Sequence, residues 1–97
     1  MSVVLSPEAV ERLEAQVAFL RDAGAMAAAE RFRARVMSFL GNHLANFPRT
    51  GRYLAERDLW EIWIPGTRLV LWYRIEHDQV LVATVWHTAQ NRQAAKP

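Results

Sequence analysis

Hydrophobic and polar positions alternate through much of the C-terminal half of the chain, from position 59 to position 87. Three apolar runs, rich in Val, Ile, Trp, Tyr and Thr, are separated by a Pro-Gly pair at 65–66 and a polar tetrad at 76–79. Such residues suit a pleated, half-buried surface, and short runs of them joined by tight polar turns are typical of an antiparallel meander. The pattern therefore predicts three neighbouring antiparallel strands.

The N-terminal half shows a different period, because its apolar positions recur every three or four residues. One such stripe covers 10–20 and follows a Ser-Pro-Glu sequence that suits the first turn of a helix. Gly24 is placed to end this helix, and a second stripe predicts another helix from about Ala25 to Ala45. The pair should form a helical hairpin, preceded by a short apolar run at 1–5 that could be an edge strand.

The middle strand of the predicted meander carries two different sets of side chains. The set that we assign to the helical hairpin is apolar throughout and consists of Leu69, Leu71, Tyr73 and Ile75. The other set alternates a cation with an apolar group and consists of Arg68, Val70, Trp72 and Arg74. At least two of the four tryptophans should be core residues, whereas Trp72 is the one that we expect to be exposed.

These elements together indicate an α+β domain. A single domain should span 1–97, with an N-terminal strand and a helical hairpin packed on one face of an antiparallel meander sheet. Between helix and sheet, 46–52 reads as a loop and 53–58 as a crossing segment. The polar residues at 88–97 read as a flexible tail.

Composition and charge narrow the function only slightly. The chain is 52% apolar and 23% charged, as expected for a globular protein, and it has no cysteine for disulfides or thiolate metal sites. Without a leader or a membrane-spanning run it reads as a soluble cytoplasmic protein. We expect no cofactor and no bound metal.

Arginine supplies nearly all of the positive charge. Of the 12 basic residues only Lys96 is a lysine, and the formal net charge is +2. The forked guanidinium suits carboxylates and phosphates, although a GC-rich genome would also favour arginine codons. Arg31 and Arg35 share one helix face, which can be a solvated face or a binding patch.

Four segments, taken together and in this order, resemble the RelE/ParE superfamily of bacterial toxins from type II toxin–antitoxin operons. They are VVLSPEAVERLEAQVAFL, FPRTGR, GTRLVLWYRI and VLVATVWHTAQNR, and the resemblance covers about 2–92. It implies a RelE/ParE-like fold with a helical hairpin on a sheet. It also implies a cognate antitoxin, with which the toxin would form a hetero-oligomer in the cytoplasm.

The superfamily holds two functional classes. RelE-like members are ribosome-dependent mRNA endoribonucleases, which need a general base, a general acid and cations beside the phosphate. In this chain Arg68, Arg74 and His87 would supply that set. ParE-like members poison DNA gyrase through a protein–protein contact.

The resemblance favours the ParE-like branch. FPRTGR is similar to the loop of that branch, and the strand ending Val-Trp-His is similar to its Val-Leu-His ending. The lysines that nuclease members carry near 59–65 are absent, and 88–97 contains no aromatic residue. The arginines that follow the histidine in many members are represented only by Arg92.

The resemblance thus implies a toxin of a plasmid-stabilisation system that arrests growth by binding gyrase. An endoribonuclease is the alternative, and an inactive member kept as a binding module is a third possibility. His87 would be either a nuclease acid/base on the open face of the sheet or a structural anchor of the last strand. The residues expected to contact the target or the antitoxin are Arg49, Arg52, Arg68, Trp72, Arg74 and Arg92.

Overall fold

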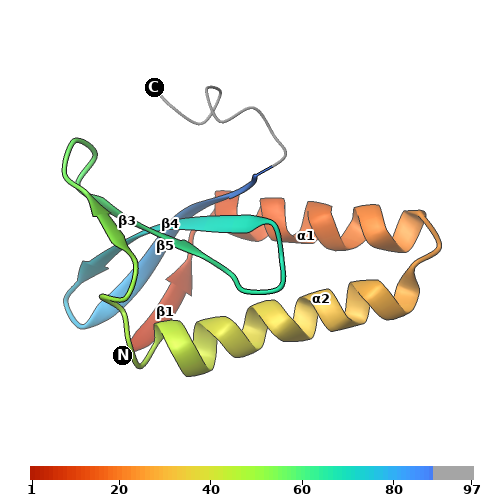
Figure 1. Cartoon of the computed structure of the whole chain (residues 1–97), viewed down its shortest axis with the longest axis horizontal. Helices are drawn as coiled ribbons and strands as arrows, with labels where there is room; N and C mark the ends of the chain where they lie inside the picture. Colours follow the sequence, from red (N-terminus) through yellow and green to blue (C-terminus); the bar gives the residue numbers. More distant parts are fainter. Residues whose placement is uncertain (89–97) are drawn as a thin grey trace.

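A computed structural model describes residues 1–88 and shows a helical hairpin covering one face of a five-stranded sheet (Figure 1). The predicted α+β class, with an N-terminal strand and a hairpin on a meander, is confirmed. No helix in this part of the chain is long and apolar enough to cross a membrane. The elements are β1 (Ser2–Leu5), α1 (Pro7–Asp22), α2 (Met26–Ser38), the π-helical turn η1 (Phe39–Leu44), β2 (Arg52–Leu54), β3 (Leu59–Trp63), β4 (Leu69–Glu76) and β5 (Gln79–His87).

The helical hairpin begins and turns where its sequence indicates. Ser6 is the N-cap of α1, and its side chain accepts a hydrogen bond from the backbone N–H of Ala9. Gly24 has a φ of 80° and ends the helix in the left-handed conformation that favours glycine. The second helix continues to Leu44 as predicted, but its last turns are π-helical, with the N–H of Ala45 donating to the carbonyl of Leu40 at 3.1 Å.

The strands lie in the order β1-β5-β4-β3-β2, so the meander β3-β4-β5 forms the centre of the sheet. β1 is an edge strand as expected, and it pairs in parallel with β5, which makes the sheet mixed. At the opposite edge, β2 pairs antiparallel with β3 where we expected only a loop and a crossing segment. A strand of three residues is too short to show a period in the sequence.

An extra residue in β5 decides which side chains face the helices. Tyr73 lies opposite Val82, but the preceding residue Trp72 lies opposite Thr84, so Ala83 forms a β-bulge. The hydroxyl of Ser6 donates to the carbonyl of Ala83 at 2.6 Å and ties the bulge to the start of α1. Beyond the bulge, the odd-numbered residues of β5 take the helix-covered side and the even-numbered ones take the other side.

The main core lies between the hairpin and the sheet. As predicted for β4, Leu69, Leu71 and Tyr73 are buried there, and Ile75 packs against the cluster. The helices contribute mainly Leu13, Val36, Phe39, Leu40 and Leu44. Burial of these apolar groups supplies the main stabilisation of the domain.

Gly51 is required where β2 begins. A Cβ at this position would lie 2.6 Å from the carbonyl oxygen of Glu61 and from the hydroxyl of Tyr73. We expect Gly51→Ala to lower the free energy of unfolding by about 1–3 kcal/mol, because the backbone must shift to relieve the overlap. Gly41→Ala is the matched control, since a Cβ there meets nothing within 4 Å, and it should be neutral or stabilising. Urea unfolding of both variants measures the difference, and equal midpoints would contradict this role of Gly51.

The phenol of Tyr73 should make stability sensitive to alkaline pH. Its hydroxyl donates to the carbonyl of Pro48 at 2.7 Å. Burial raises the pKa of Tyr73 above its usual 10.0, and a backbone hydrogen bond with Gly51 offsets part of that rise. Because the folded state then holds the proton more tightly than the unfolded state, this stabilisation is complete below pH 10 and is lost as the pH rises through the folded pKa.

We therefore expect the free energy of unfolding to fall more steeply above about pH 10 in the unsubstituted protein than in Tyr73→Phe. Urea unfolding at a series of alkaline pH values measures this slope. Tyr53→Phe is the comparison. The pKa of Tyr53 is also raised, mainly by a hydrogen bond to Asp58, but this pair is exposed and screened by solvent, so that removing it should reduce the slope less. If Tyr73→Phe kept the full alkaline slope, the buried phenol would not be its source.

Candidate functional site

The face of the sheet that points away from the helices, here called the open face, carries most of the predicted site residues. Its centre is a second, smaller core formed by Leu54, Leu59, Val70, Trp72 and Trp86. The centre of the open face is therefore a packed apolar cluster, and the charged groups lie around this cluster.

Trp72 belongs to that smaller core, so the expectation that it is exposed is wrong. Only 8% of the residue is accessible to solvent. Its ring meets Trp86 edge-on at 6.0 Å between centroids, and the guanidinium of Arg57 lies 4.8 Å from its centroid. Its Nε1 donates to Oε2 of Glu61 at 2.8 Å. The bulge in β5 moves Trp86 onto this face, and sequence alternation alone does not indicate that.

Arg52 is tied to the same carboxylate. Its Nη2 lies 3.2 Å from Oε1 of Glu61, so that Glu61 links an exposed arginine on β2 to the buried indole of Trp72. The Arg52 side chain is 70% exposed, and a surface ion pair of this kind adds at most about 1 kcal/mol. Arg49 lies on the loop before β2 and is exposed. Both arginines are accessible to a partner.

Arg68 immediately precedes β4, and Arg74 lies near the C-terminal end of that strand. They are six positions apart, which places their Cα atoms about 20 Å from each other at the usual rise of a strand. Both residues are exposed, and within residues 1–88 neither side chain makes an ion pair or a hydrogen bond. The two guanidinium groups are therefore too far apart to act on one phosphate in a single active site.

His87 lies on the helix-covered side of the sheet, and not on the open face, where its alternative role as a nuclease acid/base would have placed it. It pairs with Leu69 across the ladder, and it lines a hollow of about 340 Å³ together with Arg12 and Gln16 of α1. The bulge at Ala83 causes this change of side. Arg92 lies outside the described residues.

Trp63 is an exposed aromatic residue that the sequence analysis did not single out. It ends β3, lies opposite Val70 and is 65% exposed. Trp60 and Ile62 pack against the main core, so alternation along β3 directs Trp63 to the open face. The sequence shows that side chains of β3 alternate between two faces. It does not show which of the two faces packs on the main core, so it could not identify Trp63 as the exposed residue.

The geometry of the open face suits binding more than bond cleavage. Exposed cations and one exposed indole surround a packed apolar centre, and Trp and Arg are typical anchors of protein interfaces. Among residues 1–88, no group of three or more His, Asp or Glu side chains is placed to hold a metal ion.

Comparison with known families agrees with the fold. A family model described as the ParE toxin of type II toxin–antitoxin systems, parDE, matches residues 3–92. No curated protein matches the chain. The match spans nearly the whole sequence and includes every helix and strand described above, apart from Ser2 at the start of β1. The chain therefore belongs to the ParE toxin family of type II toxin–antitoxin systems.

Proposed function

We propose that this toxin arrests growth by binding DNA gyrase through its open face, and that a cognate antitoxin neutralises it in the cytoplasm. The toxin class and the existence of an antitoxin partner follow from the family. The gyrase target and a role in plasmid stabilisation rest on the similarity of FPRTGR and of the strand ending Val-Trp-His to the ParE-like branch.

One observation carries the choice of binding over cleavage. The Cα atoms of Arg68, just before β4, and of Arg74, within it, lie about 20 Å apart, and His87 lies on the opposite side of the sheet. A nuclease needs its acid, base and cations within hydrogen-bond reach of one phosphate. These three residues are spread over the molecule instead, whereas an interface can use separate anchors.

The exposed groups of the open face supply such anchors. Trp63 offers a large apolar surface, and Arg68 and Arg74 offer cations without partners within residues 1–88. Aromatic and arginine side chains of this kind dominate the energetics of protein interfaces. The buried Trp72 contributes indirectly, because it supports the sheet beneath them.

Induction of the gene in a bacterial host tests the proposal. Expression alone should arrest growth and induce the DNA-damage response, because a poisoned gyrase leaves cleaved DNA. Co-expression of the open reading frame encoded beside it should restore growth. Continued growth at full expression would contradict the toxin's activity and would favour an inactive binding module. Arrest with cleaved mRNA and no DNA damage would favour the endoribonuclease alternative.

A further inference from the structure

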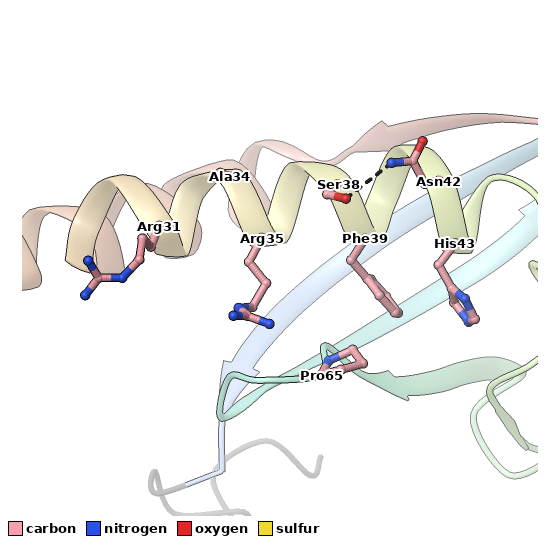
Figure 2. A pocket seen from close by; sticks show the side chains of 8 residues that line it. All are labelled: Arg31, Ala34, Arg35, Ser38, Phe39, Asn42, His43 and Pro65. Carbon is pink, nitrogen blue, oxygen red and sulfur yellow. Dashed lines mark hydrogen bonds between the residues drawn. The ribbon is translucent and has the colours of Figure 1, made fainter. Parts of the chain in front are cut away.

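A basic groove runs between the second helix and the turn that joins β3 to β4 (Figure 2). The residues that line it are Arg31, Ala34, Arg35, Ser38, Phe39, Asn42, His43 and Pro65. Its volume of about 700 Å³ falls within the range of about 300–1,000 Å³ that small-molecule sites in proteins occupy. The groove is therefore large enough to hold a small molecule.

The groove owes its lining to a regular spacing along α2 and η1. Arg31, Arg35, Phe39 and His43 follow one another at intervals of four residues, and such residues lie on the same side of a helix. Figure 2 shows all four side chains extending from one side of the helix, in the direction of Pro65. Because the arginines stand at one end of this row and the rings at the other, the groove has a cationic half and an aromatic half.

The head group of Arg35 is held beside the turn. Its guanidinium lies so close to Gly66 that a side chain at position 66 would overlap it, and Gly66 has a φ of 78°. A β-carbon is therefore excluded here both by space and by backbone conformation. This packing restrains Arg35 in the cationic half before any ligand arrives.

The cationic half carries positive charge without compensation. None of the eight lining residues is acidic, and within residues 1–88 Arg31 and Arg35 form no ion pair. Arg33, on the same helix, forms a forked pair with Glu14 of α1 at 3.2 and 3.3 Å. The hairpin thus neutralises the arginine that faces α1 and leaves the two in the groove available.

The aromatic half is built from rings that are held in place. Phe39 is buried and stacks on His43 with ring centroids 5.0 Å apart. Nε2 of His43 lies 3.2 Å from the hydroxyl of Thr50, which restrains the imidazole further. Figure 2 shows Pro65 across from the two rings. The surfaces of the ring pair and of the proline suit a flat apolar group of a ligand.

The pairing of two free arginines favours a phosphate over a carboxylate. One guanidinium fork uses both oxygens of a carboxylate, so a single arginine is enough for it. A diphosphate offers oxygens on two neighbouring phosphorus atoms, so that two arginines one helical turn apart can each donate a forked pair. Two guanidinium charges also balance the charge of about −1.5 to −2 that a terminal phosphate carries at pH 7.

We propose that the basic groove binds a nucleoside diphosphate. Arg31 and Arg35 hold the two phosphates, and the base packs between His43 and Pro65. Packing of this kind accepts any base, because every base has a flat face that stacks on aromatic side chains. Among residues 1–88, no residue that lines the groove belongs to the packed centre of the open face, and the proposal does not depend on gyrase being the target.

Isothermal titration calorimetry of the purified full-length protein tests the proposal with ADP as the probe. The buffer contains a chelator, so that Mg²⁺ does not neutralise the phosphates. Adenosine is the control without phosphates, pyrophosphate is the control without a base, and citrate is the control for general attraction of anions. We expect ADP to bind at least about ten-fold more tightly than each of them, because each lacks the contacts of one half of the groove or the phosphate geometry of the other.

Variants locate the binding. Arg31→Gln and Arg35→Gln should each weaken binding of ADP by about ten-fold. Arg33→Gln should change it less than about two-fold, because that arginine is paired with Glu14 outside the groove. For the unsubstituted protein, amide chemical shifts in a ¹H–¹⁵N spectrum should move in α2, η1 and the β3–β4 turn when ADP is added, which avoids any dependence on the folding of a variant.

Several results would overturn the proposal. ADP that binds no more tightly than adenosine would contradict the phosphate contacts, and ADP that binds no more tightly than pyrophosphate would contradict the base contact. Equal binding of citrate would indicate an adventitious ion only. Equal loss in all three variants, or chemical-shift changes confined to the open face, would place the ligand elsewhere. An oligothymidylate strand that binds the groove more tightly than ADP would favour a nucleic acid site instead.

Growth arrest by the Arg31→Gln and Arg35→Gln variants is a separate readout. Both variants keep the open face, so they should still arrest growth if gyrase is bound there. Failure of ADP to bind would therefore leave the gyrase proposal standing, and failure to arrest growth would leave the nucleotide site standing.

Discussion

Replacing Trp72 with alanine should lower the free energy of unfolding by about 3–5 kcal/mol. The indole is 8% exposed, packs edge-on against Trp86 and donates to Glu61 at 2.8 Å. Its removal would leave a cavity in the smaller core and would deprive the partly buried Glu61 carboxylate of a donor. Urea unfolding followed by circular dichroism measures the loss.

Trp63→Ala is the matched control, because it removes the same side chain from the open face at a position that is 65% exposed. Its free energy of unfolding should change by less than about 1 kcal/mol. If the two variants were equally stable, Trp72 would not be a core residue. The division of the open face into a packed centre and an accessible rim would then be wrong.

The second large effect is expected in the inhibition of the target. Here substitution of Trp63 should matter more than substitution of Trp72, the reverse of their effects on stability. If the open face binds the target, Trp63→Ala should raise the concentration for half-maximal inhibition of gyrase by about 30-fold, as loss of an interface anchor does. Arg68→Ala and Arg74→Ala should each raise it by a smaller factor. A supercoiling assay with purified gyrase measures all three.

Arg21→Ala is the control for this series, since Arg21 lies in the last turn of α1, outside the open face, and is also exposed. It should inhibit as well as the unsubstituted protein. A large effect of Arg21→Ala with no effect of Trp63→Ala would place the contact surface on the hairpin instead.

Much of the fold was predictable, because it depends on local chemistry. The cap at Ser6, the left-handed Gly24 and the helical stripes define the hairpin, and the polar tetrad defines the last hairpin turn. In that tetrad His77 and Asp78 have φ values of 49° and 61°, as a tight two-residue turn requires. These features act within a few residues of one another, so a sequence displays them.

The remaining features depend on contacts between distant segments. β2 exists because Gly51 lets the chain approach β3 closely, and a bulge at Ala83 is held by Ser6, far away in the sequence. That single extra residue moves His87 to the helix side and Trp86 to the side of Trp72. Strict alternation cannot reveal such a shift, so the expected exposure of Trp72 was wrong and the side of the sheet on which His87 lies could not be predicted.

The sequence therefore predicted which residue types form the candidate site, but not how these residues are arranged in space. Arg68 and Arg74 are exposed as a binding surface requires, whereas the accessible aromatic residue is Trp63 and not Trp72. A groove of about 700 Å³ beside Arg31 and Arg35 lies between α2 and the β3–β4 turn, and the sequence does not show that this turn lies across from the helix. Loop placement of this kind is a tertiary property.

One paired assay tests most directly whether this toxin acts by binding gyrase. The purified protein is added to a gyrase supercoiling reaction and, in parallel, to a translation extract in which mRNA integrity is followed by primer extension. We predict inhibited supercoiling with accumulated cleaved DNA, while the translated mRNA stays intact. Cleavage of mRNA on the ribosome, with supercoiling unaffected at the same concentration, would contradict the account.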